Sequence, residues 1–174
     1  METSKKKQKK VFVVAGAPGS GKSTWINENY IWDYDALISR DAIRFALIQD
    51  GDDYFSKEQE VRNEFFKEIE EATGPNKHFE NVFIDATHLN PKARAQVLRH
   101  IHKDCYIIAV SFEVPLQVAL ERNAQRTGRA FVPENVIRNM YNSFQRPRIK
   151  EGFNAIWRID ETGKTFEMEE NLYI

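Results

Sequence analysis

The octapeptide GAPGSGKS at residues 16–23 has the residue types and spacing of a phosphate-binding loop. Its glycines let consecutive backbone N–H groups curve around an anion, and a helix beginning at Lys22 would point its positive dipole end at that anion. Lys22 is expected to reach the β- and γ-phosphates, and the Ser23 hydroxyl is expected to ligate Mg²⁺. The sequence therefore predicts a nucleoside triphosphate site with ATP and Mg²⁺ as cofactors. The residues expected to form it are Gly16, Ala17, Pro18, Gly19, Ser20, Gly21, Lys22, Ser23 and Thr24.

A second block of ionisable residues, SRDAIR at 39–44, follows the second expected strand. Ligands of open parallel sheets bind at the carboxyl ends of the strands, so Asp41 lies near the γ-phosphate if the first and second strands are neighbours. A carboxylate there can accept the proton of an attacking hydroxyl. Aspartate is equally a common helix N-cap, and the sequence leaves both roles open. Arg44, on the same helix face, is placed to hold an acceptor phosphate.

Strands and helices that alternate along the chain are needed to position these two blocks. Strand-length apolar runs occur at residues 11–15, 37–38, 81–85 and 106–112. Helical patterns occur at residues 22–29, 41–49, 56–72, 91–102, 115–126 and 133–144. Ser56 with Gln59 resembles a capping box, and a hairpin turn is expected at 161–164. The alternation implies an α/β fold of the P-loop NTPase type, a parallel sheet sandwiched by helices.

Composition restricts the class of protein further. The 174 residues are 41% apolar and include twelve Phe, which argues against a disordered chain. No run approaches the ~18 apolar residues of a membrane-spanning helix, so no membrane association is expected. The single cysteine, Cys105, allows no internal disulfide, and a reducing cytoplasm is the expected location. We expect residues 1–10 to be a basic, disordered tail and residues 11–174 to form one P-loop kinase domain.

The net charge of −1 hides a local excess of basic residues that favours an anionic ligand. The acidic stretch 50–71 is expected to be a solvated face. Trp32 and Tyr34 are candidates for stacking on a nucleobase, whereas His88 is expected at the surface or in packing. Charge alone does not choose between ATP and nucleic acid as that ligand. If nucleic acid binds, a basic channel is expected, and it could be built by Arg40, Arg44, Lys92, Arg94 and Arg99.

Four blocks of the chain resemble the kinase domain of the phage polynucleotide kinase–phosphatase family. They are GAPGSGKSTW (16–25), SRDAIR (39–44), DATHLNPKAR (85–94), and RNAQR (122–126) followed by VIRNMY (136–141). The resemblance runs in order over residues 11–147. Ser39 and His88 stand where the family often has Asn. Some members carry the third-strand acid at the position of Ala86, so Asp85 is either a ligand of a metal-bound water or a plain strand-end carboxylate.

The resemblance implies an ATP-dependent kinase that phosphorylates the 5′-hydroxyl ends of DNA or RNA. It makes Asp41 the general base, assigns Arg40, Arg44 and Thr87 to the acceptor, and makes Arg126 an arginine of a helical lid that stabilises the transferring phosphoryl group. Arg122, one turn before Arg126, could share that role. The alternative is a small-molecule or zeta-toxin-like P-loop kinase acting on a sugar or nucleoside hydroxyl. A nucleotide-binding switch is disfavoured, because a closing, arginine-rich lid favours transfer over hydrolysis.

Overall fold

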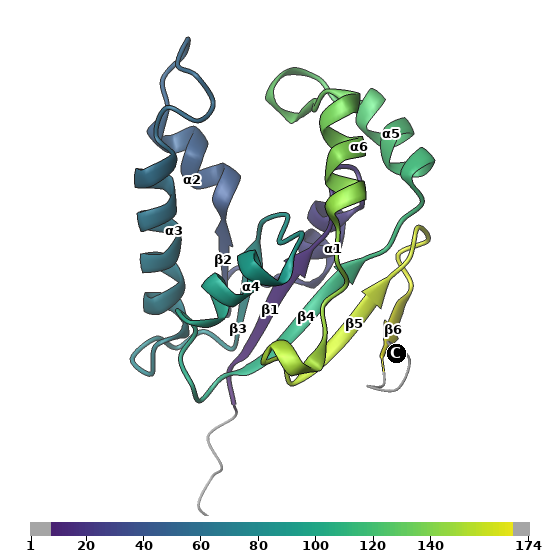
Figure 1. Ribbon diagram of the computed structural model, residues 1–174. Coiled ribbons are helices and arrows are strands. Elements are labelled where there is room, and N and C mark those ends of the chain that lie inside the picture. Colours follow the sequence, from purple (N-terminus) through teal and green to yellow (C-terminus); the bar gives the residue numbers. More distant parts are fainter. Residues whose placement is uncertain (1–7, 169–174) are drawn as a thin grey trace, which may run out of the picture.

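Six strands form one sheet in the computed structural model, which describes residues 8–168 (Figure 1). The strands are β1 (Lys10–Ala15), β2 (Asp35–Ser39), β3 (Asn81–Asp85), β4 (Tyr106–Phe112), β5 (Ala155–Ile159) and β6 (Thr165–Glu167). Their order is β2-β3-β1-β4-β5-β6, and every neighbouring pair is parallel except β5 with β6. This mostly parallel sheet confirms the fold class expected from the sequence.

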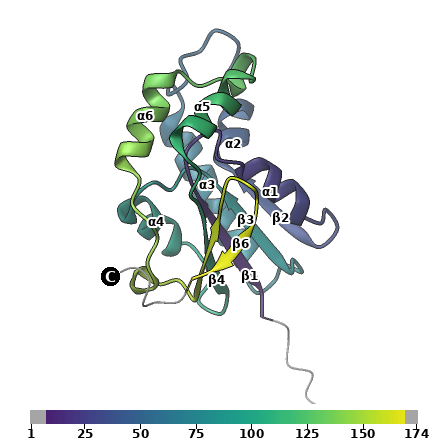
Figure 2. The ribbon, with the colours of Figure 1, turned by 90° about the vertical axis from the view of Figure 1, so that its right-hand side faces the viewer.

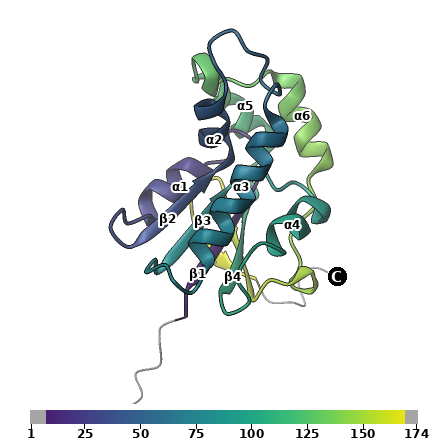
Figure 3. The same ribbon diagram turned by 90° about the vertical axis from the view of Figure 1, so that its left-hand side faces the viewer.

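Helices cover both faces of the sheet (Figures 2 and 3). They are α1 (Lys22–Asn29), α2 (Arg40–Leu47), α3 (Glu58–Thr73), α4 (Pro91–Leu98), α5 (Leu116–Ala124) and α6 (Glu134–Ser143), with 3₁₀-helices η1 (Gly128–Ala130) and η2 (Ile149–Glu151). On one face, Trp25 of α1 packs edge-on against Phe12 of β1, with ring centroids 5.8 Å apart. On the other face, Phe65 of α3 is fully buried in a cluster with Val13. Burial of these two apolar clusters fixes the helices on the sheet.

The position of β1 determines which residues flank the phosphate-binding loop. β1 lies between β3 and β4, and Val14 is level with Asp85 of β3. β1 and β2 are therefore not neighbours, contrary to the condition under which Asp41 was expected near the γ-phosphate, because β3 lies between them. β3, the strand next to β1 on this side, ends in Asp85. Asp41 follows β2, which lies one strand further from the phosphate-binding loop.

Two groups of helices stand above the carboxyl ends of the strands (Figure 1). α2 and the upper part of α3 form one group, and α5, η1 and α6 form the other. The second group is the helical, arginine-bearing segment expected from the sequence. The ends of the parallel strands therefore lie between two helical walls, where ligands of such sheets bind.

Some local expectations differ from the structure. α3 begins at Glu58 after Lys57, and no side chain caps it, so the expected capping box at Ser56 is wrong. α4 ends at Leu98 rather than at residue 102. Residues 8–10, expected in the tail, belong to the fold, since Lys9 Nζ donates to the Ala72 and Gly74 carbonyl oxygens at 2.8 and 2.9 Å. The rest of the expected tail lies outside the described residues.

Trp32 and Tyr34 precede β2, at the amino ends of the strands. Trp32 is 82% exposed. Because the phosphate-binding loop lies at the carboxyl ends, these aromatic rings are at the opposite edge of the sheet and cannot stack on a base in that site.

Within residues 8–168, no helix has the length and apolar character needed to cross a membrane.

Candidate active site

The loop between β1 and α1 packs directly on the backbone of α5. Gly19 has a φ of +81°, and a Cβ at this position would lie 2.4 Å from the carbonyl oxygen of Ala119. Any other residue would therefore be strained and would collide with α5. The contact fixes the phosphate-binding loop relative to the first helix of the lid segment.

Lys22 is the first residue of α1, where this loop ends. Its Nζ donates to the carbonyl oxygens of Gly16 and Ala17 at 2.9 and 2.8 Å. Burial lowers the pKa of Lys22 to about 8; Asp85 and Asp41 act against this shift, and Arg126 adds to it. Four charged groups from separate segments therefore lie close enough to influence one another electrostatically.

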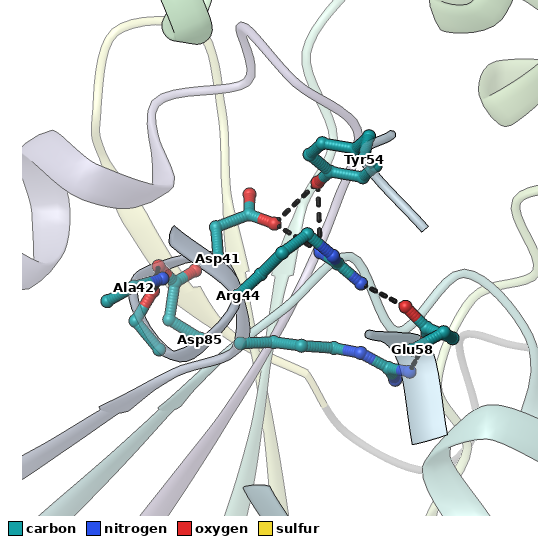
Figure 4. Close-up of polar contacts among 8 residues, drawn as sticks. Asp41, Ala42, Arg44, Tyr54, Glu58 and Asp85 are labelled. Carbon is teal, nitrogen blue, oxygen red and sulfur yellow. Dashed lines mark hydrogen bonds and ion pairs between the residues drawn. The ribbon is translucent and has the colours of Figure 1, made fainter. Parts of the chain in front are cut away.

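Asp41 projects from the first turn of α2 with only one of its carboxylate oxygens anchored (Figure 4). Oδ1 accepts hydrogen bonds from Arg44 Nη1 and Tyr54 Oη, both at 2.8 Å. The side chain is 65% exposed. Asp41 is not the N-cap of α2, because the cap is Ser39, whose Oγ accepts from the Ala42 N–H at 3.4 Å. The helix N-cap role that the sequence left open for Asp41 is therefore wrong. Its carboxylate does not cap the helix and is free to contact a ligand.

One carboxylate pairs with both arginines of the second block. Glu58, in the first turn of α3, forms ion pairs with Arg40 and with Arg44, the latter at 2.5 Å between Oε2 and Nη2 (Figure 4). Burial works against its ionisation, but the hydrogen bonds and positive charges of Arg44 and Arg40 together outweigh burial and lower the pKa of Glu58. The Arg44 side chain is only 5% exposed. An acceptor phosphate could reach Arg44 only by displacing Glu58, Asp41 or Tyr54.

Asp85 and Thr87 lie where β3 ends beside the loop. Burial raises the pKa of Asp85, Lys22 opposes the rise, and the Ser39 hydroxyl donates to Asp85 Oδ2 at 3.4 Å. The Thr87 carbonyl oxygen accepts from the Gly16 N–H at 2.9 Å. The segment after β3 is thus tied to the start of the phosphate-binding loop.

Three of the arginines in the lid segment have different surroundings. Arg122 donates to the Glu161 carbonyl oxygen at 2.7 Å and to that of Gly19 at 3.5 Å, beside the phosphate-binding loop. Arg126, just after α5, acts electrostatically on Lys22. Arg129 forms an ion pair with Asp50 at 2.8 Å. The Arg129 pair links the lid to the connection between α2 and α3, so the two helical walls touch.

Arg94 is a structural residue. It is fully buried, forms a two-bond ion pair with Glu151, and donates to the carbonyl oxygens of His88 and Gln145. It therefore cannot contribute to the basic channel expected from the sequence.

His88 is buried too, and its Nδ1 lies 2.6 Å from the Val14 carbonyl oxygen. Burial lowers the pKa of His88 to about 4, which keeps this ring neutral and agrees with a packing role.

A protein-family model described as an AAA domain matches residues 11–147, which is most of the chain and includes both walls of the site. The chain belongs to this family, AAA_33. Its mostly parallel sheet flanked by helices is the fold of P-loop NTPases of the kinase type.

The chain covers very different shares of the proteins to which it is similar. The transcription factor bHLH140 of Arabidopsis thaliana is 27% identical over 161 residues, which are 90% of this chain but 16% of that protein. A structure of the Pnkp1/Rnl/Hen1 RNA repair complex matches with a TM-score of 0.68 and 21% identity, over 97% of this chain and 51% of the matched chain. A gluconokinase from Sinorhizobium meliloti matches with a TM-score of 0.56 and 21% identity, over 89% of this chain and 84% of that one. At these identities the structures show the shared fold.

The loop of this AAA_33 domain fits a phosphate chain. Ser20 Oγ is buried without a hydrogen-bond partner among the described residues, so a polar atom in the loop is left for a ligand. Within residues 8–168, no group of three or more His, Cys, Asp and Glu side chains could hold a metal by itself. Mg²⁺ commonly takes one or two protein ligands together with phosphate oxygens and waters. Ser23 and Asp85 suit that arrangement.

Tyr54 and Glu58 are site residues that the sequence reasoning missed. Tyr54 lies in the irregular connection between α2 and α3, where no periodicity singles out one side chain. Glu58 belongs to the acidic stretch 50–71, which was expected to be solvated; for Glu58 this was wrong, because both of its oxygens are paired. The available signal was charge balance, since the two closely spaced arginines of the second block call for a counter-ion.

Proposed function

We propose that this protein is an ATP-dependent kinase that transfers the γ-phosphate to the 5′-hydroxyl end of DNA or RNA. The observation that carries the proposal is the state of Asp41: one carboxylate oxygen is anchored, the side chain is exposed, and it lies within electrostatic reach of Lys22. This is the arrangement that a general base needs beside a phosphate-binding loop.

The transfer step uses residues from both walls. The acceptor hydroxyl oxygen forms a bond to the γ-phosphorus while its proton passes to Asp41 Oδ2. The bond from that phosphorus to the β–γ bridging oxygen breaks, and its electron pair leaves with ADP. Lys22 and Arg126 offset charge on the phosphate oxygens, and Arg122 flanks the nucleotide. Mg²⁺, when bound, would be held by Ser23 and, through water, by Asp85, and would supply further positive charge.

Exposed aromatic side chains favour a nucleic-acid acceptor. Phe55 is 63% exposed and packs against Tyr54, with ring centroids 4.8 Å apart, next to the proposed base. Phe131, in the lid, is also exposed. Nucleobases stack on such rings. Arg40 and Thr87 are the proposed contacts to the acceptor strand, and Arg44 joins them if the acceptor phosphate displaces Glu58. The similarity to the Pnkp1 chain of the RNA repair complex agrees with this acceptor.

The pairing of Glu58 with both arginines favours a second candidate, a kinase of an uncharged hydroxyl in a sugar or nucleoside. An acceptor without phosphate leaves these ion pairs intact. The similarity to a gluconokinase agrees with this class of acceptor.

Transfer of labelled γ-phosphate distinguishes the two candidates. The acceptors are a 5′-hydroxyl DNA oligonucleotide, the same sequence in RNA, a nucleoside 3′-monophosphate, a free nucleoside and gluconate. The proposal predicts kcat/KM for an oligonucleotide at least ~10²-fold above that for the free nucleoside and gluconate, since base stacking and phosphate contacts each contribute about 1–3 kcal/mol. A preference for gluconate or the free nucleoside overturns the polynucleotide assignment and supports the second candidate.

A further inference from the structure

Tyr54 makes a directional contact with the proposed base. Its hydroxyl lies 2.8 Å from Asp41 Oδ1 and 2.9 Å from Arg44 Nη1 (Figure 4). A guanidinium can only donate and an ionised carboxylate can only accept, so the single phenolic proton must point to Asp41. The order of donation is therefore Arg44 to Tyr54 to Asp41.

The two donors leave the two oxygens of Asp41 in different states. Oδ1 receives one hydrogen bond from Tyr54 and one from Arg44, whereas Oδ2 has no hydrogen-bond partner in the described part of the chain. Without Tyr54, one donor would remain, and a carboxylate held by a single bond can swing about it. With both donors in place, Oδ2 has a fixed direction.

We propose that Tyr54 is a positioning residue that fixes the Asp41 carboxylate so that Oδ2 meets the acceptor hydroxyl. This rests on the proposed role of Asp41 as the base, but not on whether the acceptor is a polynucleotide or a small molecule. Proton transfer requires the base within hydrogen-bond reach of its hydroxyl, and a misplacement of about 1 Å can lower the rate by ~10²-fold.

The surroundings of Tyr54 make it suited to this role. The Arg44 guanidinium lies over its ring, 4.4 Å from the centroid, and the rings of Phe45 and Phe55 pack edge-on at 6.2 and 4.8 Å. Arg44 is itself held by Glu58. Burial, with the hydrogen bond to Asp41, raises the pKa of Tyr54 to about 12, so the hydroxyl keeps its proton throughout the neutral range. The donor to Asp41 is therefore held by several side-chain contacts and stays protonated at neutral pH.

The test is a double-mutant cycle between Tyr54→Phe and Asp41→Asn, read by steady-state and single-turnover transfer to the best acceptor of the panel above. Tyr54→Phe removes the hydroxyl and keeps the ring. We expect kcat to fall by ~10- to 100-fold while KM for ATP changes by less than about twofold. In the Asp41→Asn background, the same substitution should change kcat by less than about twofold, because its effect passes through Asp41. Tyr34→Phe, at the opposite edge of the sheet, is the matched control and should leave kcat unchanged.

Four results would overturn the inference. Equal losses from Tyr54→Phe in both backgrounds would show that Tyr54 does not act through Asp41. An unchanged kcat for Tyr54→Phe, or a rise in KM for ATP with a lower melting temperature, would reduce it to a packing residue. An Asp41→Asn enzyme with normal turnover would remove the proposed base itself, and the Tyr54 inference with it; this outcome is recognised without the Tyr54 variant.

Discussion

The Arg44 guanidinium and the Glu58 carboxylate form an ion pair that joins α2 to α3, with Nη2 and Oε2 2.5 Å apart. The same guanidinium holds Asp41 through Nη1, so the position of the proposed base depends on this pair. Removing one partner from a buried pair costs about 3–5 kcal/mol, because the other charge stays buried. Glu58 is 38% exposed, which reduces the expected cost.

We therefore expect Glu58→Gln to lower the free energy of unfolding by about 1–3 kcal/mol, measured by urea denaturation. The matched control is Glu134→Gln, which breaks the exposed i,i+4 pair with Arg138 and should cost no more than about 0.5 kcal/mol. Because pairing lowers the pKa of Glu58, its contribution is present above the ordinary glutamate pKa of about 4.3 and is lost as the pH falls further. Equal stability of the two variants at neutral pH would contradict this account.

Gly19→Ala should disrupt the phosphate-binding loop. The added Cβ would lie 2.4 Å from the Ala119 carbonyl oxygen, so the loop or α5 must move. Gly163→Ala is the control, because Gly163 has the same φ of +81° but nothing within 4 Å of the added Cβ. We expect about 1–2 kcal/mol of destabilisation for Gly163→Ala with ATP binding intact, and a larger loss for Gly19→Ala with ATP affinity reduced at least ~10-fold. Equal effects of the two substitutions would show that the contact with α5 is unimportant.

Lys22→Met should abolish phosphoryl transfer and change how stability depends on pH. The pKa of Lys22 is lowered from 10.5 to about 8, so the unfolded chain binds more protons than the folded chain between these values. The free energy of unfolding of the parent protein should therefore rise with pH over this interval, relative to Lys22→Met. Urea denaturation of both proteins at pH 7.5, 9 and 10.5 measures the difference. A difference that stays constant with pH would mean that Lys22 is solvated in the folded protein.

Arg126→Ala should lower kcat far more than it raises KM for ATP. A lid arginine meets charge that develops on the transferring phosphoryl group, and such arginines contribute ~10³ or more to kcat. Arg129→Ala removes another arginine of the lid segment and serves as a comparison, with an expected loss of less than ~10-fold because its partner is Asp50. If Arg126→Ala changed only the KM for ATP, Arg126 would be a ground-state anchor.

The elements that carry local signals were predicted from the sequence. α1 and β3 have the expected bounds because a glycine loop precedes the first and a short apolar run defines the second. The strand order was not predictable in this way, because placing β3 between β1 and β2 depends on packing between distant segments. Tyr54 was missed for the same reason: its contact with Asp41 spans 13 residues and an irregular loop. Side-chain networks of this kind produce no periodic pattern in the sequence.

Asp41→Asn is the substitution that tests the central claim most directly. Asparagine can still accept hydrogen bonds from Tyr54 and Arg44 at Oδ1, and Ser39 still caps α2, so the local structure should persist. Single-turnover phosphorylation of a 5′-hydroxyl oligonucleotide should fall by ~10²- to 10⁴-fold, which is the usual share of general-base catalysis. ATP affinity should remain within about twofold, because in the proposed site Lys22 and the loop amides, not Asp41, hold the nucleotide. Turnover at the parent rate would contradict the assignment of Asp41 as the base, and a loss of ATP binding would place Asp41 in the nucleotide site instead.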